Sequence, residues 1–315
     1  MVNETENTQN RILDILFRAR GNTLSGVKIS EETGISRVAV WKHIQALTAA
    51  GVEINTHARG YALADPDDLL FPFCFDPDLK ESIRHFQTVE TTMDTAKALA
   101  REDAPHMTCC IAERQTRGRG RLNREWVSDR GGLWFTLILK PDLPPPMAYL
   151  YNFAAALSLS RTVNRMFGMD TRVKWPNDLL LGGRKLTGLL SEMETRADMI
   201  RFLVIGIGVN VNNTPSHEGF QATSIKNELG RTVSRREILA AFLREFRPLT
   251  ETMDPRAIMT DWRRQTATIG ARVRVETLNQ TLEGIALDVD NAGSLILETD
   301  TGKTETIIYG DCFHR

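Results

Sequence analysis

Five arginines share a glycine-containing segment, RGRGRLNREWVSDRGG, at residues 117–132. Ordering a flexible segment costs conformational entropy, so a basic loop of this kind orders best on a strongly anionic ligand. Glycine leaves backbone N–H groups open to a phosphate, and arginine forks grip phosphate oxygens in pairs. The segment predicts a loop that closes on polyphosphate, an adenylate phosphate or a nucleic-acid backbone, with a solvated surface loop as the alternative. The loop residues expected at the ligand are Gly118, Arg119, Gly120, Arg121 and Trp126.

A second group of polar residues follows in VKWPNDLLLGGRKLTGLLSE, residues 173–192. Pro176 blocks regular strand pairing and Asn-Asp favours a turn, so WPND should lie between two strands. A carboxylate and an amide beside lysines suit Mg-ATP, because the lysines neutralise phosphate charge and the carboxylate lies near Mg²⁺. A hairpin with solvated charges is the alternative. The candidates are Lys174, Asn177, Asp178, Arg184 and Lys185, with Asp178 nearest the metal.

Other motifs point away from common nucleotide and hydrolase sites. GKT at 302–304 is not a phosphate loop, because Leu297 stands where that motif needs glycine. GIGVNVN at 206–212 lacks the third glycine of a dinucleotide fingerprint. No two histidines have metal-ligand spacing, and no G-x-S-x-G supports a hydrolase triad. With 39 basic and 40 acidic residues, anion binding must come from local patches.

The first fifty residues have the pattern of a helix-turn-helix. Apolar spacing predicts a helix over 8–20, Ser25 and Ser36 are expected to cap two more, and the third ends at Gly51. Alternation from 52 to 63 predicts a hairpin wing. The third helix has no acidic residue, so its exposed face suits a phosphate-lined groove, while Trp41, Ile44 and Leu47 are expected on the core side. A protein-binding mini-domain is the alternative. The DNA-binding candidates are Ser36, Arg37, Trp41, Lys42, His43 and Arg59.

The rest of the chain predicts an α+β fold. Several strand patterns follow one another without helices between them, which favours a mixed or antiparallel sheet. Strands are expected at 85–90, 108–113, 131–139, 172–181, 184–193 and 202–212, and helices at 91–102, 147–168, 234–248 and 254–265. Residues 271–309 carry four short alternating strands, typical of a small β-barrel. We expect a winged helix at 1–66, a linker at 67–82, a central domain at 83–268 and a C-terminal domain at 269–315.

Composition favours a cytoplasmic protein. The N-terminus lacks the basic and apolar segments of a secretory signal. The longest uncharged stretch, residues 143–160, contains PPP and is a poor membrane span. Four cysteines without paired spacing fit buried thiols in a reducing compartment.

Taken together, the motifs resemble the family of bifunctional biotin protein ligases and biotin operon repressors over nearly the whole chain. The matching segments, in order, are ISRVAVWKHIQAL, ETTMDTAK, AERQTRGRGRLNREW, VKWPNDL, RKLTGLLSE and GIGVNVN. The resemblance implies that biotin and ATP give biotinyl-5'-adenylate and pyrophosphate, and that a lysine of the biotin carboxyl carrier protein of acetyl-CoA carboxylase then takes the biotin. It also implies a central domain related to class II tRNA synthetases and an SH3-like C-terminal domain. A homodimer with adenylate bound would bind the operator DNA of biotin genes and repress their transcription.

The resemblance also implies residue roles. Thr91 and Thr92 would bond the biotin ureido group, Lys185 would hold the biotin carboxylate, and Trp126 would stack beside adenine. The biotin-binding residues implied are Thr91, Thr92, Met93, Gln115, Arg119, Gly120, Arg121, Lys185 and Gly188. The adenylate-binding residues implied are Gly118, Arg119, Arg121, Trp126, Asn177 and Asn210. Catalysis without an enzyme nucleophile would rest on charge and alignment from Lys185, Arg121, Lys174 and Asp178, with Mg²⁺ at Asp178.

This chain departs from the family pattern at two places. Met93 stands where asparagine is frequent and cannot supply an amide, and Leu122, Asn123 and Glu125 make the loop less basic. Weaker retention of the adenylate is the expected consequence. Three other functions remain: a biotin-sensing transcription factor without transferase activity, a plain ligase whose DNA-binding domain is not a repressor, and a lipoate-type ligase.

Overall fold

The computed structural model describes residues 4–215 and 221–314. The chain divides after Glu81 into two compact units. Within the described ranges, none of the helices combines the length and the apolar character that crossing a membrane requires.

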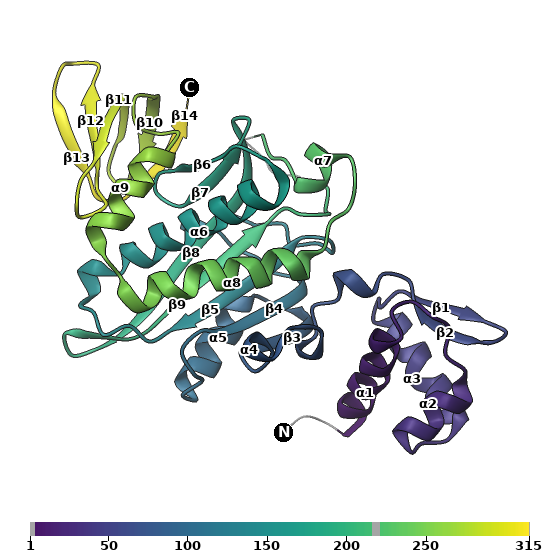
Figure 1. Ribbon diagram of the computed structural model, residues 1–315. Coiled ribbons are helices and arrows are strands. Elements are labelled where there is room, and N and C mark those ends of the chain that lie inside the picture. Colours follow the sequence, from purple (N-terminus) through teal and green to yellow (C-terminus); the bar gives the residue numbers. More distant parts are fainter. Residues whose placement is uncertain (1–3, 216–220, 315) are drawn as a thin grey trace. The chain divides into compact units, whose positions relative to one another are not determined.

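The N-terminal unit is a winged helix-turn-helix, as predicted (Figure 1). The Ser25 hydroxyl oxygen accepts a hydrogen bond from Lys28 N at 3.1 Å, and the Ser36 oxygen accepts one from Ala39 N at 3.2 Å, so both predicted caps form. The wing is an antiparallel hairpin. Its elements are α1 (Glu4–Arg18), α2 (Gly26–Thr33), α3 (Arg37–Ala49), β1 (Ile54–His57) and β2 (Gly60–Leu63).

One expectation for α3 is wrong. Val40, Ile44 and Leu47 are buried, whereas the Trp41 side chain is 52% exposed. Positions i, i+4 and i+7 share one face of a helix, so the face that buries Ile44 and Leu47 takes Val40 and turns Trp41 outward. Helix α3 therefore presents an aromatic ring to solvent.

Short helical segments follow the wing, at η1 (Pro66–Asp68), η2 (Pro72–Cys74) and α4 (Pro77–Lys80). They lie in the region expected as a linker. Phe71 is buried in the same core as Ile12 and Ile44, and Phe73 packs against that core. Part of this Pro- and Asp-rich stretch is thus packed onto the N-terminal unit.

The second unit is built on a seven-stranded mixed sheet, which confirms the α+β class. The strand order is β3-β4-β5-β9-β8-β7-β6; β3 and β4 are parallel and the other neighbours antiparallel. The strands are β3 (Ile83–Val89), β4 (Thr108–Gln115), β5 (Leu133–Leu139), β6 (Thr171–Lys174), β7 (Asp178–Leu181), β8 (Arg184–Arg196) and β9 (Met199–Val209).

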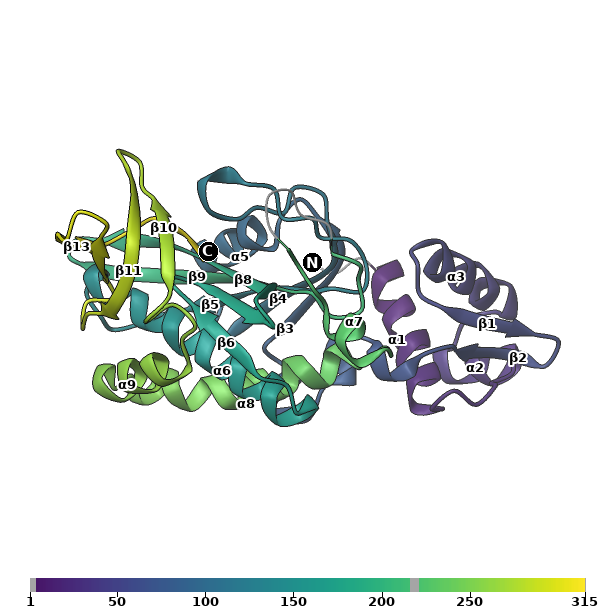
Figure 2. The ribbon, with the colours of Figure 1, turned by 90° about the horizontal axis from the view of Figure 1, so that it is seen from above.

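Helices cover both faces of this sheet (Figure 2). α5 packs on β4, β5 and β9, while α6 packs on β6, β7 and β8 from the other side and carries α8 and α9. The short α7 was not expected from the sequence. The elements are α5 (Thr92–Arg101), η3 (Arg121–Asn123), η4 (Pro145–Met147), α6 (Tyr149–Phe167), α7 (Ile225–Leu229), α8 (Arg235–Thr252) and α9 (Pro255–Gln265).

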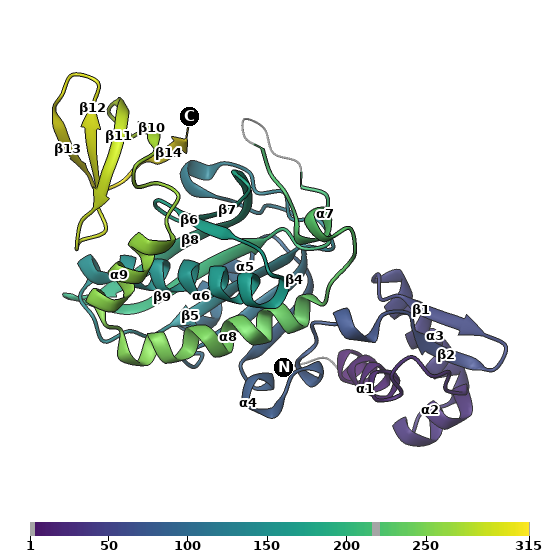
Figure 3. The same cartoon turned by 45° about the horizontal axis from the view of Figure 1, so that its top comes forward.

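The C-terminal segment is an antiparallel sheet of five strands, where four were expected (Figure 3). The fifth, β14, follows Tyr309 and pairs with β10, so the pattern at 271–309 stopped one strand short. The order is β13-β12-β11-β10-β14, with β10 (Arg272–Glu276), β11 (Thr281–Val289), β12 (Leu295–Thr299), β13 (Thr304–Ile307) and β14 (Asp311–His314).

Candidate active site

A cavity of about 360 Å³ is lined by the arginine-rich segment 117–132, called the arginine loop below, and by several parts of the sheet unit. These are the start of α5, the β6–β7 turn, strands β8 and β9, and β14. The cavity brings together most of the residues predicted from the sequence. Gly118 and Asn210 are buried and are not among the lining residues. The predicted residues that line it are Thr91, Thr92, Met93, Gln115, Arg119, Gly120, Arg121, Trp126, Lys174, Asn177, Asp178, Lys185 and Gly188.

Hydrogen bonds fix the polar residues at one end of the cavity. Thr92 donates to Gln115 Oε1 from its backbone N at 2.8 Å and from its hydroxyl at 3.0 Å. The Thr136 hydroxyl in turn donates to Thr92 Oγ1 at 2.8 Å, and Gln115 Nε2 donates to Ser128 Oγ at 2.8 Å. Because each group has a partner in a set direction, this end is preorganised. Thr136 and Ser128 were not found from the sequence, since neither belongs to a local motif.

Trp126 and two glycines that line the cavity are in close contact. The Trp126 side chain is largely buried, and a Cβ built on Gly208 would lie 2.4 Å from its Nε1. A Cβ on Gly188 would lie 3.1 Å from its Cζ3. The Lys185 ammonium lies 5.3 Å from the centroid of the same ring. The two glycines therefore leave the space that the indole occupies.

Asp178 joins two lysines in another part of the cavity lining. Its Oδ1 lies 2.7 Å from Lys185 Nζ, and its Oδ2 lies 3.4 Å from Lys174 Nζ. Burial opposes ionisation of Asp178, but the two ammonium groups outweigh it and lower the pKa of the carboxyl. Three of the predicted residues, Lys174, Asp178 and Lys185, are thus assembled around the WPND turn, and together they carry one more positive charge than negative. Trp175 and Pro176 in that turn are joined by a cis peptide bond.

The C-terminal strand β14 holds the tip of the arginine loop. Arg121 donates to the Gly310 carbonyl oxygen at 2.8 Å, and Arg124 lies 2.7 Å from an Asp311 oxygen. Burial lowers the pKa of Arg121. Phe313 and His314 also line the cavity. None of these β14 contributions was predicted, because the sequence pattern ended before this strand.

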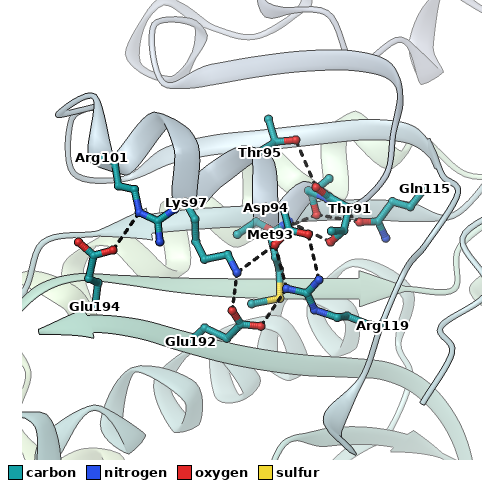
Figure 4. A network of polar contacts seen from close by, with 12 residues as sticks. Thr91, Met93, Asp94, Thr95, Lys97, Arg101, Gln115, Arg119, Glu192 and Glu194 are labelled. Atoms are coloured by element: carbon teal, nitrogen blue, oxygen red, sulfur yellow. Dashed lines mark hydrogen bonds and ion pairs between the residues drawn. The ribbon is translucent and has the colours of Figure 1, made fainter. Parts of the chain in front are cut away.

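The base of the same loop is held by different acids. Arg119 makes a two-pronged contact with Asp94 and a further hydrogen bond to Glu192 (Figure 4). Gly118 is tightly enclosed, since a Cβ there would lie 2.3 Å from the Trp126 carbonyl oxygen. This glycine therefore serves loop packing in the structure.

Two buried asparagines lie at the site, of which Asn177 lines the cavity and Asn210 does not. Asn177 Nδ2 donates to the Leu189 carbonyl oxygen across the hairpin. Asn210 Oδ1 accepts from Asn213 Nδ2 at 3.0 Å, while its own buried Nδ2 has no hydrogen-bond partner among the described residues. An unsatisfied buried amide is costly, so a partner at Asn210 would be stabilising.

The donor set does not make a metal site by itself. In residues 4–215 and 221–314 no three His, Cys, Asp or Glu side chains are grouped to hold an ion. Asp178 is one carboxylate already paired with two lysines. Any Mg²⁺ here must arrive with a phosphate ligand that supplies most of its oxygens.

The predicted DNA-binding residues lie on α3 and the wing of the N-terminal unit. His43 is half-buried and Ser36 caps α3. The exposed residues of the predicted set are Ser36, Arg37, Trp41, Lys42 and Arg59.

Three family models match the chain. The Biotin/lipoate A/B protein ligase family model matches residues 85–211, the Biotin protein ligase C terminal domain model 268–315, and the HTH domain model 8–62. A biotin protein ligase from Aquifex aeolicus in complex with biotin and ATP has a TM-score of 0.62 to this structure, with 24% identity, covering 74% of this chain and 98% of that one. At that identity the likeness shows the fold. Fold and family models together define a biotin protein ligase with an attached helix-turn-helix.

Full-length relatives narrow this further. The bifunctional ligase/repressor BirA of Bacillus subtilis is 36% identical over 307 residues, covering 92% of this chain and 94% of the relative. The BirA of Escherichia coli is 30% identical over 298 residues, covering 91% of each. The chain belongs to the family of bifunctional BirA ligase/repressors.

Proposed function

We propose that this protein is an ATP-dependent biotin protein ligase that forms biotinyl-5'-adenylate and transfers the biotin to a lysine of the biotin carboxyl carrier protein of acetyl-CoA carboxylase. The observation that carries the proposal is the cavity, whose lining combines a hydrogen-bonded group of two threonines and a glutamine with a group of two lysines paired to an aspartate. Such an arrangement suits a neutral polar ring system and an anionic reacting group respectively. A Mycobacterium tuberculosis relative, 33% identical over 213 residues, is named a biotin–[acetyl-CoA-carboxylase] ligase.

At the biotin end, Thr91, Thr92 and Gln115 would bond the ureido group. Thr92 and Gln115 hold each other in place, so binding costs little side-chain entropy. Met93 is buried against Gly206, where a Cβ would lie 2.8 Å from its Cγ, so this side chain offers apolar contact. Gly188 would allow the ligand past the Trp126 ring.

At the reacting end, Lys185 would hold the biotin carboxylate and Lys174 the phosphates. Both ammonium groups are ordered by Asp178, and their charge would stabilise the negative charge that builds up at the α-phosphate. Mg²⁺ would enter as Mg-ATP, with Asp178 as its nearest carboxylate. Arg121 and Gly120 would close over the adenylate, and Trp126 would contact the adenine. Asn210, which the resemblance also implies for the adenylate, is buried and could act only through the residues that line the cavity.

The N-terminal unit would bind operator DNA of biotin genes, as a repressor whose homodimer forms when the adenylate is bound. A dimer of winged helices would match a palindromic operator. For these roles we take residues 1–66 as the DNA-binding domain, 67–82 as a connection, 83–268 as the catalytic domain and 269–315 as the C-terminal domain.

The deciding experiment is biotin-dependent pyrophosphate release, followed by transfer of labelled biotin to a carrier domain. A gel shift with the organism's own biotin-gene promoter, with and without biotin and ATP, runs beside it. Because the matching family also contains lipoate ligases, lipoate replaces biotin in a parallel reaction. Absence of biotin-dependent pyrophosphate release would favour a biotin sensor without transferase activity. Ligation without a gel shift would favour a plain ligase that is not a repressor.

A further inference from the structure

Four charged side chains form a closed ring beside the cavity (Figure 4). Asp94 and Lys97 come from α5, Glu192 from β8 and Arg119 from the loop. Arg119 contacts both Asp94 oxygens at 2.9 Å and Glu192 Oε1 at 3.1 Å. Lys97 closes the ring with contacts of 2.9 Å to Asp94 and 2.7 Å to Glu192. Each acid therefore lies between two bases.

Of these four side chains, Arg119 lines the cavity and the other three do not. Its Nη1 and Nη2 groups make the three hydrogen bonds to the acids. The guanidinium carries five N–H donors, and these bonds use one on Nη1 and both on Nη2, so the Nε–H and one Nη1–H have no acceptor among the described residues. Where Arg119 lines the cavity, its Nη1 and Nη2 groups are thus already hydrogen-bonded to Asp94 and Glu192.

The charges of the ring cancel. Two carboxylates and two cationic groups, one ammonium and one guanidinium, leave no net charge. The ring therefore fixes the orientation of the Arg119 side chain but adds little electrostatic potential to the site. The Arg119 hydrogen bond, opposed by partial burial and helped by Lys97, holds the pKa of Asp94 at about 2, so the ring stays charged at neutral pH. To grip a phosphate with its fork, Arg119 would have to give up Asp94.

The ring also ties the loop to the biotin end. Asp94 lies directly after Met93, on the helix whose first turn carries Thr91 and Thr92. Glu192 anchors the same guanidinium to β8. Arg119 is therefore fixed relative to the threonines, whereas Arg121 is tied to β14.

We propose that Asp94 and Glu192 are positioning residues for biotin, which hold Arg119 as a fixed hydrogen-bond donor at the biotin end of the cavity and leave the phosphates to Arg121 and the lysines. The proposal rests on the ligase function proposed above. The family resemblance implies Arg119 for both biotin and adenylate; the proposal assigns it to biotin and gives Asp94 and Glu192 the task of holding it there.

The test compares Glu192→Gln with Glu194→Gln. Glu194 lies on the same strand and also pairs with α5, through Arg101 at 2.9 Å, but it touches neither Arg119 nor the cavity. Both variants remove one acid that bridges β8 and α5. Asp94→Asn removes the two-pronged contact, and Asp94→Glu keeps the charge.

Biotin affinity is measured by calorimetry, and KM for biotin, KM for ATP and kcat by pyrophosphate release. We expect Glu192→Gln and Asp94→Asn to weaken biotin binding roughly three- to tenfold with KM for ATP nearly unchanged, and Asp94→Glu to recover part of the loss. Glu194→Gln should bind biotin normally. If Asp94→Asn does not fold, Glu192→Gln decides, because it leaves the Asp94 contact intact.

Equal biotin affinity in the Glu192 and Glu194 variants would overturn the proposal. So would a larger effect on ATP than on biotin, because Arg119 would then serve the phosphates. A wild-type protein without biotin-dependent pyrophosphate release would instead refute the proposed function.

Discussion

Arg121 donates a 2.8 Å hydrogen bond from Nη1 to the carbonyl oxygen of Gly310, so the tip of the arginine loop is joined to the residue that directly precedes β14. Asp311 strengthens this junction with its 2.7 Å contact to Arg124. The loop is thus held at both ends by acids and carbonyls of its own chain: at its base by Asp94 and Glu192, and at its tip by β14. Any anion that binds Arg121 competes with these contacts or adds to them.

Removing the Asp311 charge should loosen the tip of the loop. Asp311→Asn breaks the contact to Arg124 but keeps the side-chain volume, so trypsin should cut after Arg121 or Arg124 roughly three- to tenfold faster, since cleavage follows the population of the open loop. Glu305→Gln, a surface acid of the same sheet, serves as the control. Equal cleavage rates in the two variants would show that β14 does not restrain the loop.

Arg121→Gly should release biotinyl-adenylate before transfer. The variant loses both the grip on the phosphate and the bond to Gly310, so the reactive anhydride should leave the site and label bystander proteins. The measurement is biotin incorporated into an unrelated protein relative to the carrier. Arg117→Gly is the matched control, because Arg117 belongs to the same loop but is 75% exposed and pairs only with Glu90 at 3.5 Å among its described contacts. Carrier-only labelling by Arg121→Gly would contradict the role.

The place of Trp126 can be tested through Gly208. In Gly208→Ala the new Cβ would lie 2.4 Å from Trp126 Nε1, so the indole must move and ATP binding should weaken by about tenfold or more. Adding Trp126→Phe, whose smaller ring leaves room for the methyl group, should restore part of the affinity. Calorimetric titration with a non-hydrolysable ATP analogue in the presence of biotin measures both. A double variant no better than Gly208→Ala would mean that the glycine serves the strand itself.

Local signals predicted most elements of the fold. Serine caps, apolar periodicity and the WPND turn lie in the sequence next to the structure that they cause, so α2, α3, α6 and the β6–β7 turn were all expected where they are found. The fifth C-terminal strand was missed because Asp311–His314 is too short to show alternation, and its strand character comes from pairing with β10. Trp41 was misplaced because a one-residue error on a helix turns a side chain by about 100°.

The site was predicted where chemistry is concentrated in motifs and missed where it depends on tertiary pairing. Lys174, Asp178 and Lys185 lie on three successive antiparallel strands, β6, β7 and β8, within twelve residues of sequence, so they are neighbours in the sheet as well as in the chain. The partners of the loop arginines are not neighbours in the chain: Asp94 and Glu192 lie 25 and 73 residues from Arg119, and Gly310 lies 189 residues from Arg121. No spacing rule links such pairs, so sequence reasoning treated the loop as more open than it is.

Stability should fall in acid in two steps. Burial, with Lys174 nearby, lowers the pKa of His314 from 6.5 to about 4, so the unfolded chain binds a proton more readily and stability is lost as pH falls from 6.5 towards 4. Glu113 is buried, but His85 and Arg235 lower its pKa to about 2, so its contribution is present above 4.5 and is lost as pH falls towards 2.

The first step can be isolated with His314→Asn. This variant should lose less of its melting temperature between pH 6.5 and 4.5 than the wild type does, by about 2–4 °C, while the change below pH 4 should remain. Thermal unfolding followed by circular dichroism at half-unit pH intervals measures it. Parallel curves for the two proteins would assign the loss in this range to other groups.

Salt dependence can separate the two kinds of DNA contact that are predicted for the N-terminal unit. Arg37 and Lys42 are exposed cations on α3, so Arg37→Ala or Lys42→Ala should weaken binding and reduce the slope of log affinity against log salt by about 1 each. Trp41 is exposed on the same helix but uncharged, so Trp41→Ala should weaken binding without changing the slope. Lys80→Ala, an exposed cation on α4, is the control for charge alone. All four variants should retain pyrophosphate release, which reports on the other unit. A slope reduced as much by Lys80→Ala as by Lys42→Ala would mean that general charge, and not the α3 face, carries the DNA contact.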